Sequence, residues 1–327
     1  MYSHIPEKIR HIFESTKQHG IRYNTKLARG RNVEIYIAAP NNRPINANIY
    51  LNNIIAWLNF ISDIASPKCS QTLHIYLLLT DSKKRLPEID EEPIDMIHAN
   101  TAFTTSCSSV NDIFLFRREE WFKVLMHETF HCFGLDFSSS NTDVSNARIL
   151  SLFPQVDQKT DIRLYETFCE MWGEVFHLLF CLFTTSSGKC LPFSDAKFQK
   201  ALRKEQMFSI GQSNKILQRA GYQYKELFST PLEKRKYTEN TPAFSYYVMK
   251  SLMLWNLDRF MKWCAKYATG MIQFNQDHIV EYCDFVDELT KHDGGYSKIV
   301  ERTIFGGSNG SKDTNTLRMT SIDPEWY

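Results

Sequence analysis

The residue types best suited to chemistry in this sequence lie in the stretch His127-Glu128-Thr129-Phe130-His131. Two histidines four positions apart on a helix lie one turn above each other, so both imidazoles can reach one metal ion. The intervening glutamate lies near the same ion, where it can accept a proton from an activated water. Zinc suits this site, because it binds imidazole and carboxylate and lowers the pKa of its water to about 7. We therefore predict Zn2+ as the cofactor, with both histidines as ligands and Glu128 as general base.

A second segment, residues 165–177, offers the third ligand. Glu166, Glu170 and His177 lie on one narrow stripe of the predicted helix, and apolar residues such as Phe168 and Trp172 lie toward another face. Carboxylates on such a helix cost desolvation free energy unless a cation or a hydrogen-bond donor meets them. We predict that Glu166 binds the metal and that Glu170 accepts an N–H from a ligand histidine, although these roles could be exchanged. The alternative is a solvated face, and Asp136 is a fallback ligand or a polar residue at the helix end.

The residues around the first motif predict a helix over residues 118–133. Glu119 and Glu120 are expected in its first turn, where acidic side chains complement the helix dipole. Gly134 follows at a position where helices commonly end. One side of the helix is apolar and is expected to face the interior; it contains Phe122, Leu125, Met126 and Phe130.

The two motifs together resemble those of the gluzincin zinc metallopeptidases. HExxH is followed, 35 residues after its second histidine, by Glu166 and by another acidic residue four positions later. The resemblance implies that His127, His131 and Glu166 bind zinc, that Glu128 is catalytic and that Glu170 supports a ligand histidine. It also implies a zincin-like fold and the hydrolysis of peptide bonds in a peptide or protein substrate.

The resemblance covers roughly residues 98–180. Gluzincins place an edge strand before the first helix, antiparallel to bound peptide, and residues 98–104 are the candidate. Tyr165 replaces the asparagine that precedes the ligand glutamate in some gluzincins. The third histidine of a metzincin motif would fall at Phe137, and Cys107 lacks the surroundings of the cysteine ligand in peptide deformylase. The chain also resembles uncharacterised metallopeptidase-like proteins of large DNA viruses.

Amide hydrolysis at such a site needs a donor for the tetrahedral oxyanion in addition to the zinc ion. A tyrosine or histidine from the C-terminal helices is the usual source, and Tyr246 and Tyr247 are the candidates, with His278 behind them. Helical spacing places Tyr247 among apolar residues and directs Tyr246 elsewhere. Glu128 would take the proton of the attacking water and pass it to the leaving nitrogen.

The elements around the motifs predict an α+β fold with a zincin-like α/β N-terminal lobe, a small mixed sheet and a mostly helical C-terminal lobe. We predict an N-terminal lobe over residues 1–135 that ends in the active-site helix, a helical lobe over residues 136–305 and a flexible tail over residues 306–327. Periodicity indicates helices and strands as follows: helices near 5–18, 46–65, 161–183, 194–220, 243–267 and 276–291, and strands at 33–37, 72–79 and 112–116.

The composition limits the classes of partner that we expect. With 38 basic and 37 acidic residues, the net charge of +1 argues against nucleic acid as a partner. No apolar run approaches the roughly 20 residues needed to cross a bilayer, so we expect no membrane partner. The 8 cysteines contain no CxxC pair and are expected to be free thiols in a reducing compartment. We expect a soluble intracellular protein, in the cytoplasm, or in a host cell or virion if viral. The sequence carries no indication of oligomeric state.

The sequence therefore favours a zinc metallopeptidase over two other classes. One is a non-hydrolytic zinc-containing protein that binds a peptide or partner, but such a protein has no need for Glu128. The other is a structural interaction protein whose 15 tyrosines and 23 phenylalanines form a partner surface. Metal content and peptide cleavage distinguish the three classes.

Overall fold

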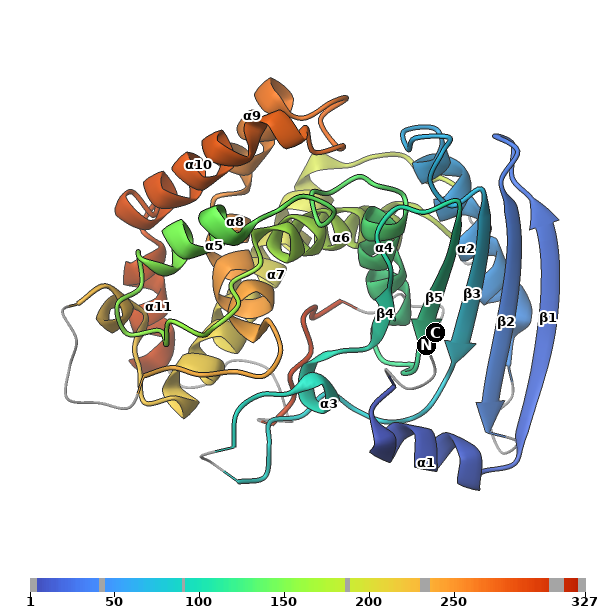
Figure 1. Ribbon diagram of the computed structural model, residues 1–327, viewed down its shortest axis with the longest axis horizontal. Helices are drawn as coiled ribbons and strands as arrows, with labels where there is room; N and C mark the ends of the chain where they lie inside the picture. Colours follow the sequence, from blue (N-terminus) through green and yellow to red (C-terminus); the bar gives the residue numbers. More distant parts are fainter. Residues whose placement is uncertain are drawn as a thin grey trace.

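The structure is a computed structural model that describes residues 5–40, 45–89, 92–185, 189–229, 236–305 and 315–322. It contains a five-stranded sheet on one side and most of the helices on the other (Figure 1). The predicted α+β class is therefore confirmed.

The sheet is mixed, with the strand order β1-β2-β3-β5-β4. Its centre consists of the parallel strands β2 (Asn32–Pro40), β3 (Thr72–Leu78) and β5 (Val110–Leu115). The outer strands β1 (Gln18–Lys26) and β4 (Ala102–Thr104) pair antiparallel to β2 and β5, respectively. All three central strands were predicted from the sequence. In the structure, buried and less buried side chains alternate along each of them. The edge strand expected within 98–104 is also present, shortened to β4.

Helices cover the sheet on both faces. On one face lie α2 (Ala47–Ser62) and α4 (Trp121–Cys132), joined by a 2.9 Å hydrogen bond from the Trp57 indole to the Thr129 hydroxyl. On the other face, α1 (Glu7–Ser15) packs through its buried residue Ile9. The short helix α3 (Met96–Ala99) leads into β4.

Helix α4 is the centre of the molecule, since all of its residues are buried. It begins at Trp121, so the prediction that Glu119 and Glu120 lie in its first turn is wrong. Glu120 instead precedes the helix with a left-handed φ of 58° and is 1% exposed. Its carboxylate lies 2.8 Å from the ammonium of Lys84, so it neutralises a buried lysine rather than the helix dipole.

The remaining helices form the other side of the molecule (Figure 1). Those predicted over 161–183, 194–220 and 276–291 are present, whereas 243–267 divides into three elements that start with a π-helix, η3. The elements are α5 (Asp143–Leu150), α6 (Leu164–Phe183), α7 (Asp195–Arg219), η2 (Tyr224–Phe228), η3 (Phe244–Met249), α8 (Lys250–Trp255), α9 (Leu257–Tyr267), η4 (Gln276–His278), α10 (Ile279–Lys291) and α11 (Tyr296–Phe305).

The apolar interior is continuous across these elements. One cluster of buried residues includes Ile35 of β2, Phe130 of α4 and Phe260 of α9. The apolar core therefore continues across residue 135, where the two predicted lobes were expected to meet. The strands of the sheet lie before this residue, and most of the helices lie after it.

The predicted tail, residues 306–327, is described only in part. Residues 306–314 and 323–327 lie outside the described residues, but residues 315–322 do not form a loose tail. Leu317 and Thr320 are fully buried, and Gln212 of α7 donates hydrogen bonds to two carbonyls of this segment. The segment lies between the helices and the sheet (Figure 1).

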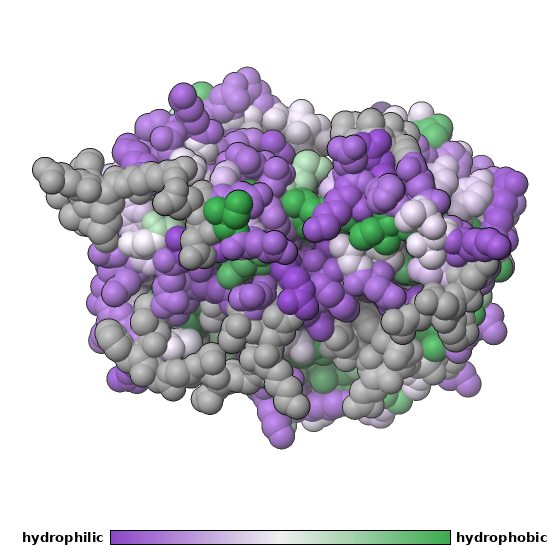
Figure 2. All heavy atoms as spheres, turned by 90° about the horizontal axis from the view of Figure 1, so that it is seen from below, coloured by the Kyte–Doolittle hydropathy of each residue, from purple (hydrophilic) through white to green (hydrophobic). Residues whose placement is uncertain are grey.

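The surface agrees with the balanced composition. Figure 2 shows one face on which most described residues are hydrophilic and hydrophobic residues form small separate spots. Among the described residues, none of the helices has the length and apolar character required to cross a membrane.

Candidate metal centre

Three predicted ligands converge between α4 and α6. The Nε2 atoms of His127 and His131 are 3.1 Å apart. One carboxylate oxygen of Glu166 lies 3.1 Å from Nε2 of His127 and 3.3 Å from Nε2 of His131. All three residues are buried. The structure therefore brings together the two histidines of α4 and the glutamate of α6, as predicted, although a short helix, α5, lies between these two in the sequence.

The other ring nitrogen of each histidine lies near a second carboxylate. Nδ1 of His127 lies 2.9 Å from Glu170, at an angle poorer than that of an ideal hydrogen bond, and Nδ1 of His131 lies 2.6 Å from Asp136. A carboxylate at this distance can accept a hydrogen bond from a protonated Nδ1, which would leave Nε2 of the same ring to bind a metal. Without a metal, a proton on Nε2 can face the Glu166 carboxylate, so the same nitrogen can bind a proton or a metal ion.

The spacing of these atoms fits a metal ion. Zinc binds nitrogen and oxygen at about 2.0–2.1 Å, and tetrahedral geometry then places neighbouring ligand atoms about 3.3–3.4 Å apart. The three observed separations of 3.1, 3.1 and 3.3 Å lie close to this value. His127, His131 and Glu166 can thus hold a metal ion, with Glu170 and Asp136 fixing the two rings.

The electrostatics of the site favour a bound cation. Burial lowers the pKa of His127, but the carboxylates of Glu170 and Glu166 outweigh it and raise that pKa to about 9. Burial opposes protonation of His131 as well, yet its acidic neighbours raise its pKa well above the usual range. For Glu166, burial is outweighed by the histidines, which hold its pKa well below the usual value. The site attracts positive charge, and a metal ion would compete with protons for the same nitrogens.

Asp136 was predicted as a fallback ligand, and the structure places it behind His131 instead. Gly134 has a left-handed φ of 66°, which turns the chain back after α4. Asp136 thereby reaches Nδ1 of His131 and accepts a 3.0 Å hydrogen bond from Ser138. His131, Asp136 and Cys169 form a second buried group whose atoms lie close enough to hold a cation, but its nitrogen is Nδ1.

The ligands open onto a pocket of about 300 Å³. Glu128 lines it beside the ligands, as expected of a general base, and burial raises the pKa of its carboxyl. The edge strand β4 forms part of the wall, through Ala102, Phe103 and Thr104. The pocket therefore combines candidate metal ligands, a carboxylate and the edge of a sheet.

The two tyrosine candidates lie in different surroundings. Tyr246 lines the pocket, and its ring centre lies 6.3 Å from that of His127. Tyr247 does not reach the site, because its hydroxyl donates a 2.6 Å hydrogen bond to the carbonyl of Leu317. His278 does not line the pocket and packs on Tyr267.

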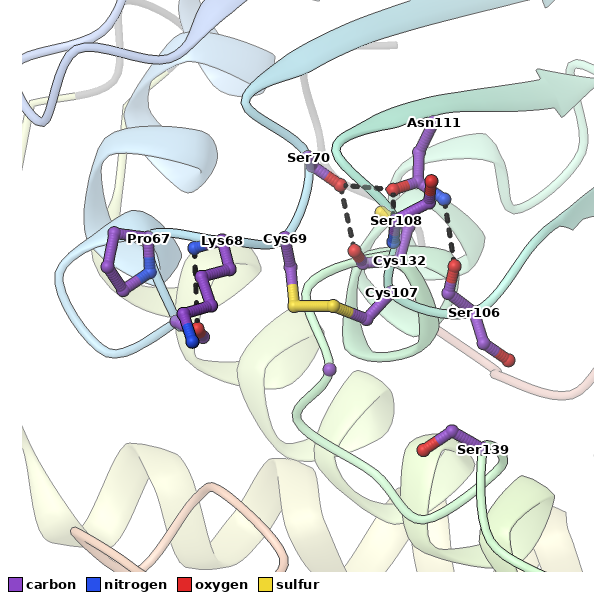
Figure 3. Close-up of a disulfide and its surroundings, with 12 residues drawn as sticks. Pro67, Lys68, Cys69, Ser70, Ser106, Cys107, Ser108, Asn111, Cys132 and Ser139 are labelled. Atoms are coloured by element: carbon purple, nitrogen blue, oxygen red, sulfur yellow. Dashed lines mark hydrogen bonds between the residues drawn. A yellow bond between two sulfur atoms is a disulfide. The ribbon is translucent and has the colours of Figure 1, made fainter.

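A disulfide lies just beyond the C-terminal end of α4 (Figure 3). It joins Cys69, before β3, to Cys107, in the turn between β4 and β5. Gly134 lies against it, and a Cβ atom added there would be 3.0 Å from the Cys69 sulfur. Nearby, Ser70 donates a 2.8 Å hydrogen bond to the carbonyl of Cys132 in α4. The expectation that all cysteines are free thiols is therefore wrong, and Cys107 is unavailable as a metal ligand.

Comparison with known proteins gives one distant similarity. The chain is 25% identical over 324 residues to a protein of Acanthamoeba polyphaga mimivirus that is described only as uncharacterised. The aligned part covers 89% of this chain and 79% of the mimivirus protein. No protein-family model matches the chain, and no solved structure matches it. The similarity agrees with the resemblance to proteins of large DNA viruses.

Proposed function

We propose that this protein is a zinc-dependent metallopeptidase of the gluzincin type. The observation that carries the proposal is the convergence of three buried atoms, Nε2 of His127, Nε2 of His131 and a carboxylate oxygen of Glu166. Both histidines have their second nitrogen against a carboxylate, which leaves Nε2 free to bind a metal. Two imidazoles and one carboxylate are a common protein ligand set of catalytic zinc.

The bound zinc would polarise the scissile carbonyl and lower the pKa of the attacking water. Glu128 lies beside the ligands and would accept a proton from that water. Burial raises the pKa of the Glu128 carboxyl. The higher pKa makes the carboxylate a stronger base toward the attacking water. The same carboxyl would then donate the proton to the leaving nitrogen of the amide.

Tyr246 supplies the second donor that the proposal needs. Burial raises the pKa of its hydroxyl well above the usual value, so the hydroxyl keeps its proton. A protonated hydroxyl on the pocket wall can donate to a carbonyl oxygen as negative charge develops there. Phe244–Met249, the segment that contains Tyr246, is a π-helix, a form that occurs frequently at functional sites.

A peptide is the substrate class that the pocket favours. Strand β4 is the last strand of the sheet at this edge and also lines the pocket. An edge strand can pair with an extended peptide through its backbone N–H and C=O groups. The proposal includes neither nucleic acid nor membrane as a partner.

Metal analysis together with a peptide-library assay tests the proposal. Wild-type protein should bind about one zinc ion per chain and cleave peptides. Glu128→Gln should keep the zinc and lose cleavage, because only the proton acceptor is removed. His131→Ala should lose both, and Tyr246→Phe should keep the zinc with a reduced kcat. Zinc binding and peptide binding without turnover would instead identify a non-hydrolytic binding protein. Absence of zinc binding would refute the proposal.

A further inference from the structure

A buried lysine lies directly behind the metal centre. Lys123 precedes His127 by one turn of α4 and is fully buried. Its ammonium contacts one carboxylate oxygen of Glu170, and the other oxygen of Glu170 lies 2.9 Å from Nδ1 of His127. Glu170 thus joins the lysine on one side to a ligand histidine on the other.

This arrangement restricts how Glu170 can lie. A buried ammonium is unfavourable unless a paired anion compensates the lost hydration, and Glu170 is the carboxylate in contact with Lys123. With one oxygen held by the lysine, the second oxygen is directed at the imidazole. The orientation of the imidazole in turn determines where its Nε2 lone pair points.

The C-terminal segment closes this group from water. Met319 places its sulfur 3.7 Å from the Lys123 ammonium. The backbone N–H groups of Met319 and Thr320 each donate a 2.7 Å hydrogen bond to Glu120, and Lys250 donates a 2.8 Å hydrogen bond to the carbonyl of Met319. The segment is anchored on both sides of Met319, so Lys123 is enclosed by protein atoms.

We propose that Lys123 is a positioning residue of the metal centre, which acts through Glu170 to hold His127 in its metal-binding orientation. The inference rests on the proposed function for the presence of a metal. It goes further by assigning a role to a side chain that touches neither the metal nor the substrate.

The chain offers a matched control. Lys250 is also fully buried, and its ammonium lies 2.7 Å from Glu174, one turn beyond Glu170 on α6. Glu174 is in no described contact with a ligand histidine. Lys123→Met and Lys250→Met each leave a buried glutamate without its lysine, so both should lower stability. Lys250→Met also removes a hydrogen bond to the Met319 carbonyl, but the N–H groups of Met319 and Thr320 still hold the segment on Glu120. Only Lys123→Met should therefore disturb the metal.

The experiment measures zinc affinity by chelator competition and the visible spectrum of the Co2+-substituted protein, which reports ligand geometry. Lys123→Met should weaken zinc binding about 10- to 100-fold and change the cobalt spectrum. Lys250→Met should retain the zinc affinity and the spectrum of the wild type. Lys123→Met/Glu170→Gln should match Glu170→Gln alone, because the lysine acts through the glutamate.

If the wild type binds zinc, two results would overturn the inference without overturning the proposed function. One is an unchanged zinc affinity and cobalt spectrum in Lys123→Met. The other is a zinc affinity of the double variant that is lower than that of Glu170→Gln, by the same factor that separates Lys123→Met from the wild type. If Lys123→Met does not fold, the double variant, which leaves no unpaired charge buried, is compared with Glu170→Gln alone. Equal zinc affinities then support the inference, and a weaker affinity of the double variant overturns it. Absence of metal binding in the wild type would overturn both the inference and the proposed function.

Discussion

Two overlapping groups in the interior compete as the metal site, and substitutions can distinguish them. The first is His127, His131 and Glu166, and the second is His131, Asp136 and Cys169. We expect the metal in the first group, because both Nε2 atoms face Glu166. Asp136 then orients His131 through a 2.6 Å contact with Nδ1 and does not bind the metal.

A metal ligand and a residue that orients a ligand should lose different amounts of zinc affinity when they are replaced. Zinc bound by four protein ligands contributes about 10–16 kcal/mol, so one ligand accounts for about 3–4 kcal/mol, or roughly a few hundred-fold in affinity. Glu166→Gln should lose about this much. Asp136→Asn keeps an oxygen that can accept the Nδ1 proton and should lose only about 10- to 100-fold, in line with other partners of ligand histidines. Cys169→Ser should leave zinc affinity unchanged.

Competition with a chromophoric chelator at fixed pH gives all three affinities. Circular dichroism of each metal-free variant checks that the loss is not one of folding. The reverse order would refute our reasoning: if Asp136→Asn and Cys169→Ser abolish binding while Glu166→Gln does not, the second group holds the metal.

Three further predictions concern protons and the disulfide. Zinc affinity should fall about tenfold from pH 8 to pH 7, because the pKa of His127 is raised to about 9 and zinc must displace its proton; a pH-independent Kd would contradict this. Burial raises the pKa of Glu239 to about 8, above its value of about 4.3 in the unfolded chain. Its stabilising contribution is therefore complete below about pH 4.3 and is lost as the pH rises through about 8. In urea unfolding, Glu239→Gln should lose less stability over this range than the wild type. Replacing Cys69 and Cys107 together by serine should cost up to about 4 kcal/mol of unfolding free energy, since the bond closes a long loop; equal midpoints for wild type and variant would contradict this.

Several parts of the fold were predictable because their signals are local. The central strands alternate between buried and less buried residues, and α6 and α7 carry long helical patterns. Strand β1 was missed, because its side chains are mostly exposed and no alternation marks it. The helix predicted over 243–267 was continuous, whereas the chain forms a π-helix and two α-helices there. Helical spacing nevertheless directed Tyr246 away from the apolar residues around Tyr247, and in the structure only Tyr246 of the two lines the pocket.

The sequence by itself determined the residues of the candidate metal centre that share a helix. The i, i+4 spacing puts His127 and His131 on one face of α4, and the same spacing puts Glu166 and Glu170 on one face of α6. Only the tertiary structure decided how the two faces meet, that Asp136 turns back to His131, and that Lys123 contacts Met319, 196 residues later. The physical reason is range: helical periodicity relates residues within a few turns, whereas these contacts depend on how separate elements pack and where the chain reverses.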